Sequence, residues 1–176
     1  MAGLFGTDGI RGKAGYHPIS PEILYAAART FAELRTGSEI LVGMDTRESS
    51  SDIAGWICTG LTDGGCTPRF CDVLPTPVLA YGIRHLPVSG GIMITASHNP
   101  YMDNGVKFFD SMGVKISDQE EATLTEAVGH RLYTPNAFLK PRTDDIQATL
   151  MRRYANDLLE NLEWQDVPMI LVPLDC

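Results

Sequence analysis

Amphipathic helical segments and short apolar strands alternate along most of this chain, and this alternation limits its fold more than any other feature. A helix is predicted over residues 21–34, where apolar side chains recur every three to four residues after a proline. Apolar strands are predicted over residues 39–44 and 69–74, and further helices over residues 51–61 and 75–85. Such alternation is typical of an α/β domain, in which helices cover the faces of a sheet.

The strand predicted over residues 90–95 is almost free of polar side chains, which is typical of a strand covered on both faces. A fourth strand is predicted over residues 105–110, returning beside it in the antiparallel direction, with residues 113–116 as an extension. A helix over residues 117–128 begins with several acidic residues, as helix N-termini prefer. We therefore predict an α/β fold with a mixed, mostly parallel sheet between helical layers.

The C-terminal part of the chain is organised differently. Residues 129–141 contain two prolines and no regular period, which indicates a surface connection. A helix is predicted over residues 144–162, followed by an apolar strand over residues 169–176 that needs a sheet to join. We therefore divide the chain into a domain of residues 1–141 and a segment of residues 142–176, formed by a connecting helix and the first strand of a second domain.

Composition excludes several classes of function. The formal net charge is −8, and no cluster of basic residues exceeds Arg152-Arg153, so nucleic acid is not expected as a partner. No apolar run approaches the roughly 20 residues needed to cross a bilayer, and the first residues lack the layout of an export signal. We expect a cytoplasmic protein without a membrane partner. The four cysteines and four histidines lack the spacing of a zinc site or a disulfide framework.

The loop after the strand of residues 90–95 carries the first candidate chemistry. Ser97 follows that strand, and ligands gather where the carboxyl ends of strands meet in an α/β sheet. Asn99 precedes a proline, which keeps its backbone out of the helical region. Asn104-Gly105 is expected to supply the positive φ angles of a tight reversal. Lys107 would then return alongside Ser97, so that its ammonium faces the hydroxyl.

Two interpretations of this pair are open on the residues alone. A nucleophilic serine needs a base within reach, and Lys107 or the adjacent His98 could serve Ser97. The G-x-S-x-G motif of acyl-transfer hydrolases is absent, since Ser97 is flanked by Ala96 and His98. Alternatively, Ser97 caps the loop and Lys107 is a solvated residue of an edge strand.

Two further segments contain candidate phosphate contacts. Glycine stands at every third position from residue 3 to residue 12, and such a backbone can approach a phosphate closely, with Arg11 as a bidentate donor. A flexible terminus would explain this segment equally well. The segment 43–50 leaves a strand and enters a helix, where Ser49 and Ser50 are interpreted as helix caps. Arg47 is either a cation at the start of that helix or a group pointing toward Ser97.

Together the three segments resemble the α-D-phosphohexomutase family. Residues 5–12 resemble its opening loop, Asp45-Thr46-Arg47 with the following serines its second landmark, and residues 95–100 its phosphoserine signature. The amino-acid sequence of residues 101–109 is most similar to the phosphoglucosamine mutase branch of this family. The three motifs occur in the family's order and cover nearly the whole chain, so the resemblance implies the fold of the family's first domain.

The resemblance also implies roles for individual residues. Ser97 would carry the transferable phosphate, one oxygen of which binds Mg²⁺, with Lys107 as general acid/base and His98 as an adjacent contact. The implied phosphate and substrate contacts are Arg11, Thr7, Arg47 and Asn99. The implied reaction moves a phosphoryl group between O6 and O1 of an aminosugar phosphate, with a sugar 1,6-bisphosphate as intermediate and activator.

The family has four domains, and the metal, sugar and second phosphate loops of its later domains do not occur in residues 1–176. The resemblance therefore implies an amino-terminal domain, truncated and inactive alone, whose partners are the missing carboxy-terminal domains or a second copy in a homodimer. Two alternatives stay open. One is a stand-alone, non-catalytic module for phosphosugar binding or subunit interaction, and the other is a fragment of a phosphomannomutase or phosphoglucomutase.

Overall fold

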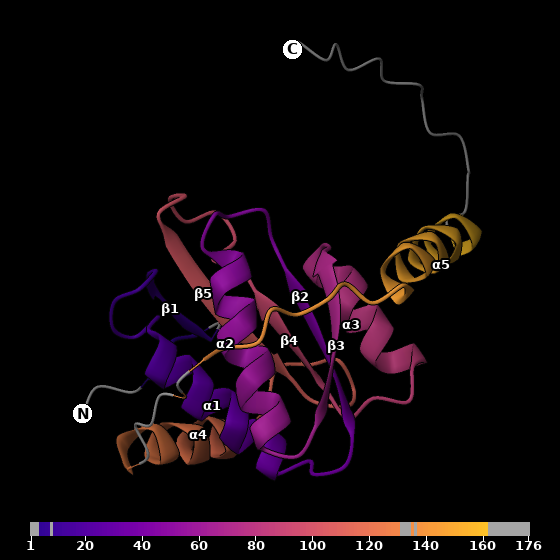
Figure 1. The fold of residues 1–176 in the computed structure, drawn as a ribbon. Coiled ribbons are helices and arrows are strands. Elements are labelled where there is room, and N and C mark those ends of the chain that lie inside the picture. Colours follow the sequence, from indigo (N-terminus) through magenta and orange to yellow (C-terminus); the bar gives the residue numbers. More distant parts are fainter. Residues whose placement is uncertain (1–3, 8, 131–134, 136, 162–176) are drawn as a thin grey trace.

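The computed structural model describes residues 4–7, 9–130, 135 and 137–161. Helices and strands alternate as predicted, apart from a first strand that the sequence analysis does not contain (Figure 1). In chain order the elements are β1 (Ile10–Lys13), α1 (Pro21–Glu33), β2 (Glu39–Met44), α2 (Ser50–Asp63), β3 (Thr67–Val73), α3 (Thr76–His85), β4 (Gly91–Ile94), β5 (Asp103–Phe109), α4 (Asp118–His130) and α5 (Ile146–Asn161).

The strands form one five-stranded sheet in the order β1-β5-β4-β2-β3. β2 pairs in parallel with β3 and with β4, whereas β5 is antiparallel to both β4 and β1. The predicted mixed sheet and the antiparallel return of residues 105–110 are confirmed. β1 adds a second antiparallel pairing, so the two directions occur equally often among the pairings. Residues 113–116 form only an isolated bridge, between Phe109 and Lys115.

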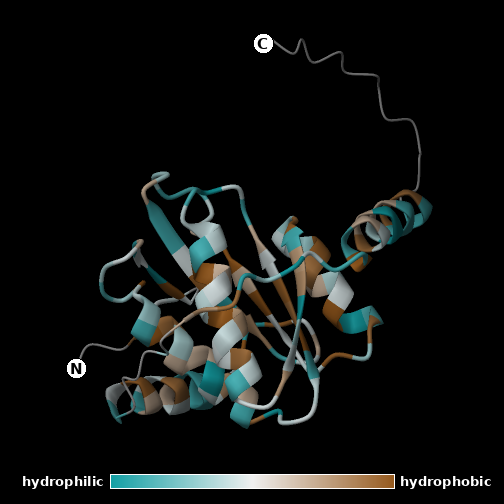
Figure 2. Cartoon of the chain, viewed as in Figure 1, coloured by the Kyte–Doolittle hydropathy of each residue, from teal (hydrophilic) through white to brown (hydrophobic). Residues whose placement is uncertain are grey.

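The two faces of the sheet are covered by different helices, because successive side chains of a strand point to opposite sides. Even-numbered residues of β2, β4 and β5, such as Ile92 and Phe108, pack with α1, α2 and α4 in one core cluster. Odd-numbered residues such as Leu41 and Met93 pack with α3 and α5 in a second cluster. Figure 2 shows apolar residues along the central strands and the helices beside them. The predicted sheet between helical layers is therefore confirmed.

α5 lies beside α3 and is held to it and to β3 by several contacts (Figure 1). Leu150 is only 1% exposed and belongs to the second core cluster. The Tyr81 hydroxyl donates to Asp157 at 2.6 Å, and Arg69 on β3 forms an ion pair with Asp144 just before α5. The predicted strand over residues 169–176 lies outside the described residues, and the division of the chain after residue 141 stays a prediction.

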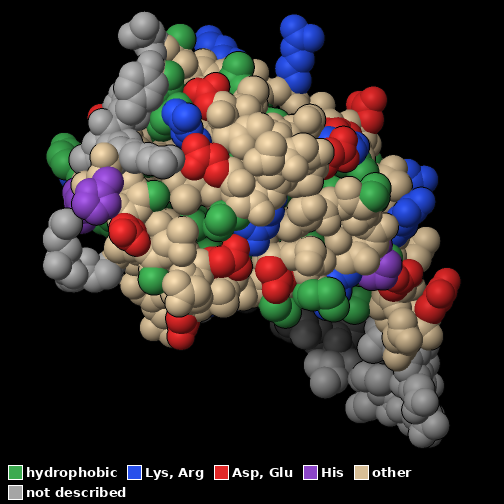
Figure 3. All heavy atoms as spheres, turned by 90° about the horizontal axis from the view of Figure 1, so that it is seen from below, with side chains coloured by type: hydrophobic (Ala, Val, Ile, Leu, Met, Phe, Trp, Pro, Cys, Tyr) green, Lys and Arg blue, Asp and Glu red, His purple; other side chains and the backbone are tan. Residues whose placement is uncertain are grey.

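The surface of the described part is charged and mixed. On the face drawn in Figure 3, acidic and basic side chains are interspersed with small apolar patches. Within the described residues, none of the helices combines the length and the hydropathy required to cross a membrane.

Candidate active site

Ser97 lies just beyond the carboxyl end of β4, next to the end of β2. The two strands are parallel and in register there, and the Asp45 N–H donates to the Ile94 carbonyl at 2.9 Å. Ser97 is exposed and has a φ of 56°, in the left-handed region that non-glycine residues seldom adopt. Its own N–H donates to the Thr95 hydroxyl at 2.9 Å. A serine in this conformation must be held there by its surroundings.

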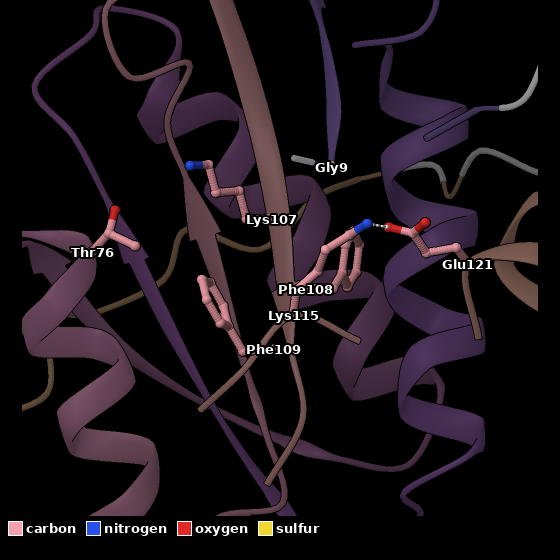
Figure 4. Close-up of a pocket in the computed structure, with 7 residues that line it drawn as sticks. All are labelled: Gly9, Thr76, Lys107, Phe108, Phe109, Lys115 and Glu121. Atoms are coloured by element: carbon pink, nitrogen blue, oxygen red, sulfur yellow. Dashed lines mark ion pairs between the residues drawn. The ribbon is translucent and has the colours of Figure 1, made fainter. Parts of the chain in front are cut away.

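Lys107 reaches Ser97 from the neighbouring strand. It lies opposite Met93 in the antiparallel pair of β4 and β5, and its Nζ donates to Ser97 Oγ at 3.3 Å. The structure thus brings the two side chains together as the sequence analysis expects. Lys107 also borders a cavity of about 170 Å³ together with Thr76 and Phe109 (Figure 4). The lysine that contacts the Ser97 hydroxyl therefore also borders an open space, with the Thr76 side chain at its margin.

The expected tight turn at Asn104-Gly105 is wrong. Both residues belong to β5, and neither has a positive φ. Gly105 is required for another reason, because a Cβ at this position would lie 2.7 Å from the Thr95 carbonyl oxygen and 3.1 Å from that of Ile10. The flanking strands β4 and β1 therefore approach too closely for a side chain. Along the path from β4 to β5, it is Ser97 that adopts the positive φ.

Arg47 reaches the loop that carries Ser97 and binds its backbone. The side chain is only 8% exposed, and Nε donates to Asp45 Oδ2 at 2.9 Å. Nη1 and Nη2 donate to four carbonyl oxygens, those of Pro100 at 2.6 Å, Asp103 at 2.9 Å, Ser97 at 2.9 Å and Asn99 at 3.0 Å. Of the two orientations considered for Arg47, the structure shows the one toward Ser97. Within the loop, the partners of Arg47 are all backbone carbonyl oxygens.

Asp45 anchors this arrangement and stays ionised. Its carboxylate accepts the Ser50 hydroxyl at 2.9 Å, the Arg47 N–H at 3.2 Å and the Arg47 guanidinium. Burial raises the pKa of Asp45, but the hydrogen bonds from Thr95, the Arg47 N–H, Ser50 and the guanidinium outweigh burial, so the pKa lies below its usual value. A fixed negative charge therefore orients the Arg47 side chain.

Asn104 is a member of the site that the sequence analysis treats only as a turn residue. It is fully buried, its Nδ2 donates to Ser49 Oγ at 3.0 Å and to Ser50 Oγ at 3.1 Å, and its Oδ1 accepts the Gly105 N–H at 2.8 Å. Ser49 does stand at the N-cap of α2, as interpreted from the sequence, but its side chain makes no capping hydrogen bond, and Ser50 is already the first residue of the helix. The serines instead join the start of α2 to β5.

The other predicted site residues lie around this network and differ in their solvent exposure. Asn99 is half-buried, and its Nδ2 donates to Asp103 Oδ2 at 3.2 Å. Arg11 lies on β1 opposite Gly105 and so shares a sheet face with Lys107, two residues further along β5. Thr7 lies in a turn closed by the Gly6 N–H and the Gly9 carbonyl at 2.9 Å. Thr7 and His98 are both exposed and stand outside the hydrogen-bond network around Arg47.

A metal site is not formed by the described residues alone. No group of three or more His, Cys, Asp or Glu residues within them could hold a metal ion. The Asp45 carboxylate is already engaged by its hydrogen-bond donors. A phosphate on Ser97 is thus the one metal ligand that the sequence analysis assigns to this region.

Comparisons with known proteins identify the family to which this fold belongs. Residues 2–133 match the family described as phosphoglucomutase/phosphomannomutase, alpha/beta/alpha domain I. A phosphoglucosamine mutase of Hyphomonas neptunium is 39% identical over 181 residues, covering 98% of this chain and 39% of that protein. A phosphoglucosamine mutase of Marinomonas is 46% identical over 125 residues, covering 69% of this chain and 28% of that protein.

Solved structures show the same architecture. A protein of Thermus thermophilus assigned as a phosphomannomutase superposes with a TM-score of 0.70 at 29% identity, covering 90% of this chain and 36% of that one. A Burkholderia thailandensis protein of the phosphoglucomutase/phosphomannomutase family gives 0.68 at 22% identity, covering 88% and 35%. The chain thus spans well under half the length of these relatives. By the match over residues 2–133, the chain belongs to the phosphoglucomutase/phosphomannomutase family and carries its domain I.

Proposed function

We propose that this chain is the phosphoserine domain of a phosphoglucosamine mutase, in which Ser97 receives and returns the phosphoryl group. The observation that carries the proposal is the 3.3 Å contact between Lys107 Nζ and the exposed Ser97 Oγ. Relatives named phosphoglucosamine mutase support the choice of sugar. The complete protein would interconvert glucosamine 6-phosphate and glucosamine 1-phosphate through the 1,6-bisphosphate, in the cytoplasm. A phosphomannomutase or phosphoglucomutase is the alternative.

The proposed step at Ser97 transfers a phosphoryl group from a sugar oxygen to the serine hydroxyl. As Ser97 Oγ bonds to phosphorus, the bond from phosphorus to a sugar oxygen breaks, the hydroxyl proton of Ser97 passes to Lys107 in its amine form, and the departing sugar oxygen takes up a proton from water. In the reverse direction Lys107 returns the proton to Ser97 as the phosphoryl group leaves. A phosphoserine carries roughly −1.5 to −2 charges and needs nearby cations. Lys107 and Arg11 share the sheet face beside it, while His98, Thr7 and Asn99 remain proposed contacts.

Turnover is proposed to need more than the described residues. The phosphate on Ser97 would give Mg²⁺ one oxygen ligand, whereas Mg²⁺ takes an octahedral set at 2.0–2.1 Å. Mg²⁺ would neutralise charge on the transferring phosphoryl group when bound. Because the chain covers 39% of a relative that it matches along its length, we propose that the remaining ligands and the sugar contacts come from the rest of a complete mutase.

Phosphoryl transfer to the chain tests the proposal directly. The chain is incubated with glucosamine 1,6-bisphosphate and Mg²⁺, and intact mass and peptide mapping are recorded. We expect one added phosphoryl group, on Ser97. Ser97→Ala should abolish it, and the matched change Ser111→Ala, at an exposed serine following β5, should not. Transfer that survives Ser97→Ala, or a phosphoryl group mapped to another residue, would contradict the proposal.

The role of Lys107 is tested separately. Lys107→Ala should slow transfer to Ser97, because it removes the basic group nearest to the hydroxyl. Lys115→Ala is the matched control, since Lys115 borders the same cavity but is paired with Glu121 at 3.0 Å (Figure 4). Equal rates for the two variants would remove Lys107 from the proposed mechanism.

A further inference from the structure

We infer that Arg47 is a positioning residue that sets the backbone of the Ser97 loop, and that it does not bind the transferred phosphate. The inference rests on the proposed function of Ser97, which it deepens. It begins from the donors of Arg47. A guanidinium has five N–H groups, and the bonds to Asp45 and to four loop carbonyls use all five. A phosphate could gain a bond only if the loop lost one.

The acceptors span the whole path from β4 to β5. They are the carbonyl oxygens of Ser97, Asn99, Pro100 and Asp103, and Asp103 is already the first residue of β5. A planar guanidinium fixes its acceptors in a defined fork, unlike the ammonium of lysine. One side chain from the β2–α2 connection therefore determines the shape of the loop.

The amide and the carbonyl of Ser97 are both linked to the Asp45 carboxylate, each through one intervening side chain. The Ser97 carbonyl accepts from Arg47, and the Ser97 N–H donates to the Thr95 hydroxyl. Arg47 and Thr95 in turn both bind Asp45. Because its amide and its carbonyl are both hydrogen-bonded, Ser97 keeps a φ of 56°, a conformation that is unfavourable for a residue with a side chain. This conformation places Oγ within 3.3 Å of Lys107.

A positioning residue and a phosphate ligand leave different kinetic signatures. Loss of a ligand to the phosphate weakens donor binding and raises the donor concentration at half-saturation. Loss of a positioning residue lowers the transfer rate at saturating donor and leaves half-saturation unchanged, since a misplacement of 1 Å can cost about 10²-fold in rate. Arg47 is expected to show the second signature.

The test compares Arg47→Lys with Arg69→Lys in the 176-residue chain. Arg69 is a matched control because it also makes several hydrogen bonds, to Asp144 and Glu39, but lies on β3 away from the loop. Amide hydrogen exchange at Ser97, Asn99 and Asp103 is followed by NMR. All three amides donate within this segment. We expect at least tenfold faster exchange in Arg47→Lys and no change in Arg69→Lys.

Transfer kinetics with glucosamine 1,6-bisphosphate give the second readout. We expect a fall of about 10²-fold in the saturating rate for Arg47→Lys, with half-saturation changed less than about twofold. Unchanged loop exchange, or a raised half-saturation at full rate, overturns the inference. If the unchanged chain takes no phosphoryl group, the exchange result alone decides the role of Arg47. Should Arg47→Lys not fold, Asp45→Asn replaces it, with the same expected direction in both readouts.

Discussion

The change Asn104→Ala tests whether the polar network beneath the Ser97 loop stabilises the fold. Asn104 is 0% exposed and makes three hydrogen bonds, two to the hydroxyls of Ser49 and Ser50 and one from the Gly105 N–H. Alanine removes the partner of the Gly105 amide, which is buried between β4 and β1. The two hydroxyls lose a donor, although Ser50 keeps its bond to Asp45.

The expected loss follows from these three contacts. A buried donor left without a partner costs about 1–3 kcal/mol, and each ordinary hydrogen bond contributes about 1 kcal/mol net. Asn104→Ala should therefore lower the free energy of unfolding by about 3–5 kcal/mol. For a domain of this size, that corresponds to a fall of about 6–20 °C in the unfolding midpoint.

The assay is urea and thermal unfolding followed by far-ultraviolet circular dichroism, with Asn99→Ala as the control. Asn99 is the same residue type five positions earlier, is half-buried, and makes one side-chain bond of 3.2 Å to Asp103. Its loss should cost less than about 1 kcal/mol. Equal losses for the two variants would refute the reasoning, because burial and bond number would then not decide the cost.

Three further predictions concern other parts of the chain. Leu150→Ala should lower the free energy of unfolding by about 2–4 kcal/mol and open α5 to proteases, while Leu158→Ala, at a residue 48% exposed on the same helix, should do neither. Asp45→Asn should reduce the loss of stability as the pH falls below about 4, because a carboxylate with a lowered pKa stabilises the fold fully above its unfolded pKa and stops doing so as the pH falls through the folded pKa. Burial raises the pKa of Cys58 to about 12, so alkylation mapped by mass spectrometry should leave Cys58 unmodified until denaturant is added.

The parts of the fold that could be predicted are those set by local periodicity. The apolar spacing of α1 and the continuous apolar run of β4 are visible in the sequence because each segment must bury a face. β1 escaped prediction because a strand of four residues, one of them Gly12, has too few side chains to show a period of two. Its pairing partner, β5, lies at least 90 residues away along the chain.

Some features of the site could likewise be predicted from the sequence, and others could not. The contact between Ser97 and Lys107 could be predicted, since an antiparallel return fixes which residues of two strands lie side by side. The partners of Arg47 could not, because backbone carbonyls belong to every residue and leave no pattern in a sequence. Nor could the burial of Asn104, since the same Asn-Gly pair is the strongest local signal for a turn. Asn104 instead lies in β5, where its side chain forms tertiary hydrogen bonds with Ser49 and Ser50.

The polar network explains how a serine can be both exposed and precisely placed. The buried or half-buried groups, Asp45, Ser50 and Asn104, lie on the side of the loop that faces β2 and α2. An apolar replacement there could pack as stably, since buried polar groups gain little net energy. It could not orient Arg47, which binds the Ser97 carbonyl, or Thr95, which accepts the Ser97 amide N–H. The network therefore serves orientation more than stability, and it leaves the other side of Ser97 to Lys107 and, in the proposed function, to the phosphate donor.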